Sequence, residues 1–186
     1  LTITYAGSLY FHRTPEPLFG AVAQLIETGR CSTKDVRIVL LGHCRYVNGV
    51  ETAALVRRYS LEEVVDVIDR VPYAEAVRTM QRSHLLLVLA PERHRLVVPA
   101  KIFDYLGTGN VVMGLAEAGA TADLIRDTQC GPCFSHTDIP GIREYLASML
   151  AQGRYRTLRN QPALFSRYDA RELTTRLIEE MGRAQG

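Results

Sequence analysis

The sequence has no tryptophan, only two lysines and no long run of apolar residues. Its longest apolar run, Leu85 to Ala90, is far shorter than the roughly 18 to 20 residues that a membrane helix needs, so we predict neither a transmembrane segment nor a signal peptide. Neither sign of charge dominates, because 22 Lys and Arg stand against 20 Asp and Glu, for a net charge of +2. This balance gives no indication of nucleic-acid binding, and we expect no nucleic-acid partner.

Cysteine and histidine are too sparse for the sites that they usually build. The four cysteines, at positions 31, 44, 130 and 133, are too few and too irregular for a disulfide framework, which predicts a reducing, cytoplasmic location. None of the five histidines has a second histidine at metal-ligand spacing, so we expect no metal. The glycine motifs G-x-G-x-x-G and G-x-x-x-x-G-K-[ST] are absent too, which argues against a dehydrogenase or a P-loop enzyme.

What the sequence does contain is the material for one globular core. Its 186 residues, 47% of them apolar, suit a single domain spanning 1–186 rather than two domains. Leu1 begins a strand pattern directly, with no lead-in, so we expect the chain to be the second half of a longer protein.

Short apolar runs alternate with amphipathic stretches along the chain. The runs are rich in Val, Ile and Leu, as strands covered on both faces require, and lie at 1–6, 36–41, 64–68, 85–90 and 111–115. Helical patterns lie at 15–27, 51–59, 73–82, 99–106, 120–128, 139–151 and 163–181. This alternation predicts an α/β, Rossmann-like open parallel sheet with helices on both faces. Ligands of such a sheet bind beyond the carboxyl ends of the strands.

Two loops at that edge carry candidate binding groups. In "GSLYFHRTP", the backbone amides after Gly7 and the charge of Arg13 would both favour a phosphate. An ordinary strand-to-helix loop with a solvated arginine explains the same residues. In "DRVPY", Val71 and Tyr73 offer backbone groups at the sheet edge, although Pro72 is also a plain helix start.

The segment "PAKIFDYLGTG" is the most specific part of the sequence. It predicts a helix over 99–106 that is ended by Gly107. The side chains expected to pack on the sheet are Ile102, Phe103 and Leu106. Those expected to project elsewhere are Lys101, Asp104 and Tyr105. The carboxylate of Asp104 can accept hydrogen bonds from two sugar hydroxyls, and the amides before it suit a diphosphate. The helix dipole alone also favours an aspartate there, so both interpretations stay open.

The tetrad Cys130-Gly131-Pro132-Cys133 has the sequence of a thiol-disulfide redox centre. In thioredoxin-like proteins such a tetrad opens a helix, whose N-terminus stabilises the thiolate. Here it follows the predicted helix 120–128, so Gly131 would be the left-handed residue that ends the helix, with Pro132 as a stop. The C-terminal end of the helix dipole would raise the pKa of a thiol. We therefore predict a helix stop followed by a strand at 133–135, rather than a redox site.

Four segments, in order, resemble a known family. They are "ITYAGSLYFHRTPEPLFGAVAQL", "HLLLVLA", "VPAKIFDYLGTGNVVMGL" and "ATADLIRDTQCG". Together they resemble the C-terminal, nucleotide-sugar-binding domain of retaining glycosyltransferases of the GT-B fold, the glycosyl transferases group 1 class. The resemblance spans nearly the whole chain, and its most specific part is the pattern P-x-K-[IL]-[FY]-[DE]-Y-L-x-x-G, which begins at Pro99. It implies one half of a two-domain enzyme, with the N-terminal acceptor domain absent from this chain and closing helices at about 163–181.

The resemblance also implies roles for particular residues. Asp104 falls on the acidic residue that holds the donor ribose, and the backbone at 71–73 falls where the base is held. Ser8 stands where an arginine is common and Arg13 where a lysine is common. The donor-binding set that it implies is Gly7, Ser8, Arg13, Val71, Tyr73, Pro99, Lys101 and Asp104. Leu96 stands where family members often carry a second acidic residue.

The implied reaction transfers a sugar from a nucleoside-diphosphate sugar, of UDP or GDP type, to a glycan or lipid-linked acceptor with retention at the anomeric carbon. Arg13 and the loop amides would stabilise the charge on the leaving diphosphate. No tightly bound cofactor is expected. The acceptor would bind through the N-terminal domain, so the isolated domain would be inactive. The parent protein would act in polysaccharide biosynthesis, in the cytoplasm at the inner face of the membrane. The alternatives are a non-catalytic, flavodoxin-like nucleotide-binding or regulatory module and a sugar-nucleotide epimerase, which shares the two-domain fold.

Overall fold

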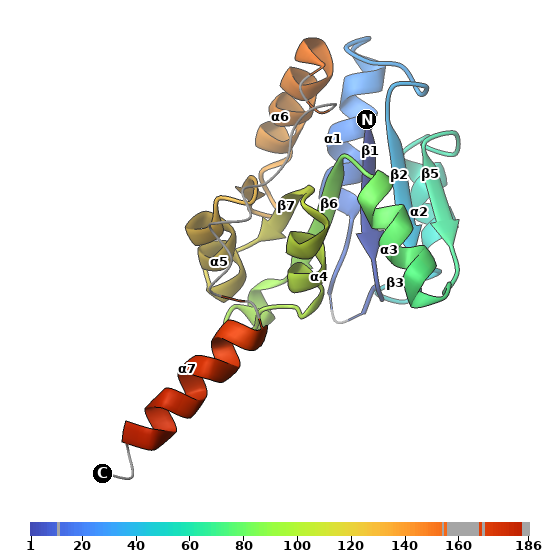
Figure 1. The fold of residues 1–186 in the computed structure, drawn as a ribbon. Helices are drawn as coiled ribbons and strands as arrows, with labels where there is room; N and C mark the ends of the chain where they lie inside the picture. The colour runs from blue at the N-terminus through green and yellow to red at the C-terminus, as the bar shows by residue number, and fades with distance from the viewer. Residues whose placement is uncertain (11, 154, 156–167, 169, 184–186) are drawn as a thin grey trace.

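A six-stranded parallel sheet forms the centre of the molecule, in the order β5-β2-β1-β6-β7-β8 (Figure 1). The computed structural model describes residues 1–10, 12–153, 155, 168 and 170–183. The strands of the sheet are β1 (Thr2–Ala6), β2 (Arg37–Leu41), β5 (Val65–Ile68), β6 (Leu85–Ala90), β7 (Val111–Ala116) and β8 (Cys133–Phe134). Every neighbouring pair is parallel, as the sequence predicts.

Helices cover both faces of this sheet. One apolar core joins a face of the sheet to α1 (Glu16–Glu27), α2 (Thr52–Arg58) and α6 (Ile139–Gln152). A second core joins the other face to α3 (Tyr73–Arg82), α4 (Lys101–Thr108) and α5 (Ala120–Thr128). The central strands β6 and β7 are buried along their whole length, which explains their unbroken apolar sequences. The predicted Rossmann-like α/β fold is confirmed.

The winding of the sheet reverses between β1 and β6. The chain leaves β1 for β2 on one side and reaches β6 from the edge strand β5 through α3. β1 pairs with β2 along five residues but with β6 at only two, Ile3 and Thr4. Where β1 and β6 part, the hydroxyl of Tyr105 accepts a hydrogen bond from the backbone N–H of Ala6 at 2.8 Å. Open α/β sheets bind ligands beyond the strand ends at such a reversal.

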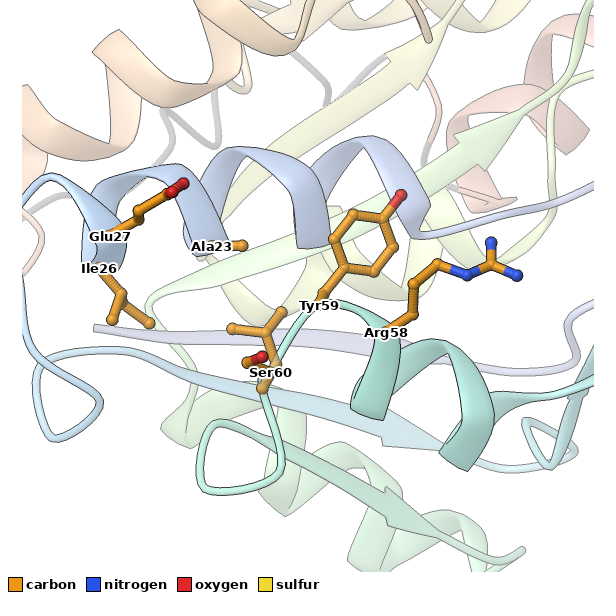
Figure 2. Close-up of a pocket in the computed structure, with 7 residues that line it drawn as sticks. Ala23, Ile26, Glu27, Arg58, Tyr59 and Ser60 are labelled. Atoms are coloured by element: carbon orange, nitrogen blue, oxygen red, sulfur yellow. The ribbon is translucent and has the colours of Figure 1, made fainter.

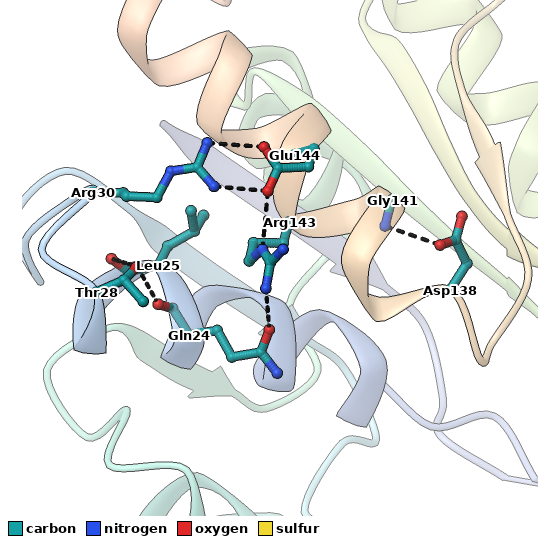
Figure 3. A network of polar contacts seen from close by, with 8 residues as sticks. All are labelled: Gln24, Leu25, Thr28, Arg30, Asp138, Gly141, Arg143 and Glu144. Carbon is teal, nitrogen blue, oxygen red and sulfur yellow. Dashed lines mark hydrogen bonds and ion pairs between the residues drawn. The ribbon is translucent and has the colours of Figure 1, made fainter.

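The packing of α6 against α1 shows how the helical layer is held (Figure 3). Arg30 donates to both carboxylate oxygens of Glu144, at 2.7 and 2.9 Å, and Arg143 donates to the side chain of Gln24 at 3.0 Å. The Arg30 and Glu144 side chains stay about half exposed, so this ion pair contributes little stability. Burial of the apolar side chains of α6 against the shared core therefore holds the two helices together.

The helix α4 differs from the sequence prediction in its bounds and its orientation. It begins at Lys101 rather than at 99, and it ends at the left-handed Gly109 (φ 77°) rather than at Gly107. The assignment of two side chains is also wrong: Tyr105 is fully buried, whereas Phe103 is 41% exposed. Tyr105 can be buried because its hydroxyl hydrogen-bonds the end of β1, a long-range partner that helical periodicity does not reveal.

The structure adds three elements to the predicted set. A hairpin of β3 (Tyr46–Val47) and β4 (Val50–Glu51) turns through Asn48 and Gly49, both with positive φ. This Asn-Gly turn is a strong sequence signal for a hairpin. A 3₁₀ turn, Glu92–His94, follows β6.

The last helix, α7 (Ala170–Arg183), overlaps the predicted helix 163–181, of which residues 163–167 and 169 lie outside the described residues.

The cysteine tetrad follows α5, as predicted, although the residue that ends the helix is not Gly131. Gln129 takes the left-handed conformation, with φ 49° and ψ 29°. Gly131 has a φ of 158°, and a Cβ atom on it would collide with the carbonyl oxygen of Val112. Cys130 and Cys133 are free thiols, and burial raises the pKa of both, to about 11 for Cys133. Burial is thus the main cause of the raised thiol pKa values, whereas the sequence analysis attributed such a rise to the helix dipole.

Candidate functional site

The carboxyl ends of β1 and β6 bring the loop after β1 next to the start of α4. Gly7 ends β1 with a φ of 137°, a conformation that favours glycine, and its N–H donates to Leu41 of β2 at 2.8 Å. A Cβ atom at Gly7 would collide with the Nζ atom of Lys101. The glycine is therefore required for the backbone turn, and its lack of a side chain also leaves the space that the lysine occupies.

Lys101 carries a buried amine without a polar partner. Its Nζ atom lies 3.7 Å from the centre of the Tyr5 ring. Among the described residues, no acceptor hydrogen-bonds this atom and no carboxylate forms an ion pair with it. Burial, and then the charge of Arg13, lower the pKa of Lys101 from 10.5 to about 7.

Arg13 is the second cation of this site. Its guanidinium stacks on the Tyr10 ring, with the central carbon 4.5 Å from the ring centre. Its Nε atom is buried without a hydrogen-bond partner, and no ion pair joins Arg13 to a carboxylate in the part of the chain that is described. An arginine stays charged in a protein. The loop after β1 and the start of α4 therefore hold two neighbouring basic groups without a counter-charge.

The backbone of the same loop offers a hydrogen-bond donor. The amides of Gly7 and Leu9 donate to Leu41 and His43, whereas that of Ser8 has no acceptor within the described residues. The carbonyl of Gly7 accepts from the thiol of Cys44 at 3.3 Å. Because a trans peptide points its N–H opposite to its C=O, the Ser8 N–H points away from Cys44. Gly7, Ser8, Arg13 and Lys101 thus form one group of predicted site residues.

Asp104 and Tyr73 form a second group. Both side chains are exposed, and the Tyr73 hydroxyl donates to Oδ1 of Asp104 at 3.1 Å. This hydrogen bond and the charge of Asp104 raise the pKa of Tyr73. Tyr73 begins α3, after β5, and Asp104 lies in the first turn of α4, so the pair spans the opening between two helices on one face of the sheet.

The other predicted positions contribute less to this arrangement. Pro99 is buried, has no N–H, and its carbonyl already accepts from Ile102 at 3.0 Å, so it serves the start of α4 rather than offering a ligand contact. Val71 is half-buried just before α3. Leu96 is 85% exposed in the loop between β6 and α4. Tyr5, which carries the Lys101 amine on its ring, gives no sequence signal, because a tyrosine in an apolar strand normally indicates core.

Cavities lie at this edge and elsewhere. One of about 400 Å³ lies at the carboxyl ends of β1, β2 and β5, lined by Leu9, His43, Arg45, Tyr46 and Asp69. Another, of about 540 Å³, is formed by the loop 92–97 after β6. A third, of about 430 Å³, lies between α1 and α2 on a helical face of the sheet, where Tyr59 and Arg58 line it (Figure 2). The first two adjoin the predicted site.

The described residues contain no group of three or more His, Cys, Asp or Glu side chains placed to hold a metal ion. None of the helices formed by these residues has both the length and the apolar character needed to span a bilayer.

Several solved structures that share this fold are glycosyltransferases. WaaG, a glycosyltransferase involved in lipopolysaccharide biosynthesis, is 19% identical over 83% of this chain and 39% of its own, with a TM-score of 0.64. HepE of Anabaena, solved in complex with UDP, is 18% identical over 98% of this chain and 48% of its own, with a TM-score of 0.68. The C-terminal domain of LpcC, a glycosyl transferase group 1 family protein of Francisella tularensis, is 14% identical over 89% of this chain and 84% of its own, with a TM-score of 0.64.

These likenesses establish the fold. The chain spans less than half of the length of WaaG and of HepE, and most of the LpcC structure, which is itself a C-terminal domain. No protein-family model matches the sequence, and no curated protein matches it. The α/β Rossmann-like fold of this chain is thus the one found in part of each of these glycosyltransferases.

Proposed function

We propose that this chain is the donor-binding domain of a retaining glycosyltransferase that transfers a sugar from a nucleoside-diphosphate sugar to a glycan or lipid-linked acceptor. One observation carries the proposal: Arg13 and Lys101 lie together at the sheet reversal, without a counter-charge among the described residues. Two neighbouring basic groups of this kind lack acceptors in the empty site, and a diphosphate is an anion large enough to contact both. The glycosyltransferase structures with this fold, one of them holding UDP, support the same ligand class.

The proposed donor lies across the two groups of residues. The base contacts the backbone at 71–73, the ribose hydroxyls hydrogen-bond the carboxylate of Asp104, and the diphosphate lies over Gly7 and Ser8 between Arg13 and Lys101. Tyr73 then shares Asp104 with the ribose or moves away from it, since its hydroxyl occupies Oδ1 in the free protein.

In the proposed reaction, the bond between the anomeric carbon and the diphosphate breaks through an oxocarbenium-like transition state. Negative charge then collects on the leaving diphosphate. Arg13, Lys101 and the Ser8 N–H would stabilise that charge, because positive groups and hydrogen-bond donors beside a leaving group act where its charge develops. The sugar acceptor and further catalytic groups belong to an N-terminal domain in this proposal, with the parent protein acting at the inner face of the membrane in polysaccharide synthesis.

Calorimetric titration of the chain with UDP, GDP, ADP and FMN tests this function. We expect one nucleoside diphosphate to bind and FMN not to bind. In Asp104→Ala the dissociation constant should rise at least tenfold, because hydrogen bonds to a charged group contribute about 1.5 to 3 kcal/mol. Asp123→Ala is the matched control, since Asp123 is an exposed aspartate in the first turn of α5. Its affinity for the nucleotide should equal that of the wild type.

Three outcomes would contradict the proposal. Binding of FMN, or of none of the four ligands, would favour the flavodoxin-like module instead. Transfer of sugar by the purified 186-residue chain would contradict the proposed split between a donor-binding and an acceptor-binding domain, because we expect this chain to bind a donor and to be inactive by itself.

A further inference from the structure

We infer that binding of a diphosphate at this site is coupled to the uptake of one proton by the Lys101 amine. This inference rests on the proposed anion site, and it concerns the protonation of that site rather than its ligand. In the free protein the amine is mostly neutral above pH 7, and in the complex it is an ammonium ion. The proton comes from solvent and binds to the lone pair of Nζ, and no other bond changes.

The first argument is the burial of the amine. A buried ammonium ion needs hydrogen-bond acceptors or a counter-charge, and without them the neutral form is favoured. Lys101 has neither in the described structure, because its Nζ atom is enclosed by the Tyr5 ring and the backbone of Gly7. The ring face attracts a cation, but this attraction is smaller than the loss of hydration.

The second argument is the charge of the groups around the amine. From the loop after β1, Arg13 is a cation and disfavours a second positive charge. From the loop after β2, Cys44 has a pKa raised to about 12 by burial and is a neutral thiol. Burial also raises the pKa of Tyr5 and of Tyr105 in α4, so both are neutral phenols. Asp104, one turn along α4, is exposed to solvent and is not among the groups that act on the amine.

A diphosphate reverses both effects. Its oxygens supply the acceptors that the amine lacks, and its charge outweighs that of Arg13. The ammonium form then becomes favoured, and the protein takes up a proton as the ligand binds. The same coupling requires diphosphate affinity to fall as the pH rises above 7, because each complex then needs a proton that is scarcer in solution.

The composition of the chain makes a direct test available. Lys34 and Lys101 are the two lysines, so protein labelled with ¹³C at the lysine ε-carbon gives two side-chain NMR signals. Lys34→Arg removes the other lysine signal, so the signal that remains is assigned to Lys101. The signal is followed from pH 5.5 to 9.5, first for the free protein and then with saturating inorganic pyrophosphate.

We expect the free Lys101 signal to titrate near pH 7 and its midpoint to rise by at least one pH unit with pyrophosphate. Pyrophosphate affinity should then fall about fivefold or more between pH 7 and pH 9 beyond the change due to the ligand's own ionisation. Lys101→Arg should bind pyrophosphate without this excess pH dependence, because arginine stays protonated. A free midpoint above pH 9, a midpoint unmoved by saturating pyrophosphate, or no pyrophosphate binding would overturn the inference.

These results separate the inference from the proposed function. If pyrophosphate moves the Lys101 signal but no nucleoside diphosphate binds, the coupling stands and the glycosyltransferase proposal fails. If UDP or GDP binds in an Asp104-dependent way while the Lys101 signal stays in place, the proposed function stands and the coupling fails.

Discussion

The stability of the ligand-free protein should rise with pH between 7.0 and 8.5, and Lys101→Met should abolish this rise. The pKa of Lys101 is about 7 in the folded chain, whereas that of an unperturbed lysine side chain, as in the unfolded chain, is 10.5. The unfolded chain therefore holds up to one proton more than the folded chain in this window, and the free energy of unfolding increases with pH. Integration over these 1.5 pH units gives about 1.5 kcal/mol.

The window has physical limits at both ends. Below about pH 7 the lysine is protonated in both states, so its contribution to stability levels off. Above about pH 9 the buried thiols of Cys44 and Cys133 lower the free energy of unfolding as the pH rises. Their pKa values, raised to about 12 and 11, keep them protonated when folded, whereas they ionise when unfolded.

Urea denaturation followed by circular dichroism measures the effect, since the chain has no tryptophan. Unfolding free energies at pH 7.0 and 8.5 are compared for the wild type, Lys101→Met and Lys34→Met. Lys34 is exposed, so its substitution should leave the rise of about 1.5 kcal/mol in place. Equal pH dependence in the wild type and Lys101→Met would refute the reasoning, because every other titrating group is common to both proteins.

Three other substitutions or treatments test the surrounding structure. Gly131→Ala should lower the urea midpoint markedly or prevent folding, because its Cβ atom would collide with the Val112 carbonyl; a midpoint equal to that of the wild type would contradict the geometry. Asn110→Ala should cost about 1 to 3 kcal/mol in the same assay, because it removes the buried donor of the Ser83 carbonyl and leaves the Met80 carbonyl with the Ser83 N–H alone; a loss below 0.5 kcal/mol would mean that water replaces the amide. Cys133 should react with iodoacetamide at pH 8 far more slowly than a free cysteine, because its pKa is about 11; labelling at the rate of glutathione would restore the redox interpretation.

The sequence predicts the layers of this fold better than the orientation of its helices. Strand positions follow directly from burial on both faces, which demands unbroken apolar runs such as Leu85 to Ala90. The orientation of α4 is tied instead to two hydrogen bonds between Tyr105 and Ala6, residues far apart in sequence. A rule based on helical spacing therefore exchanges the environments of Tyr105 and Phe103.

The candidate site is predictable in its residue types and not in its electrostatics. Gly7, Arg13 and Asp104 stand out because glycines, cations and a carboxylate at strand ends are typical of anion and sugar binding. Lys101 enters the predicted site through the family resemblance. The Lys101 amine is buried on the Tyr5 ring because α4 approaches β1 closely. This approach cannot be predicted from the sequence. The coupling of protonation to binding thus follows from the three-dimensional arrangement.

The contact between Tyr105 and Ala6 also bears on protein engineering. It fixes α4 to β1 in the middle of the helix, while Lys101 and Asp104 lie on the preceding turn. Positions that face a ligand can therefore be randomised in a library without releasing the helix from the sheet. A search for altered ligand preference should hold Tyr105 constant and vary its neighbours, so that selection acts on recognition rather than on the recovery of folding.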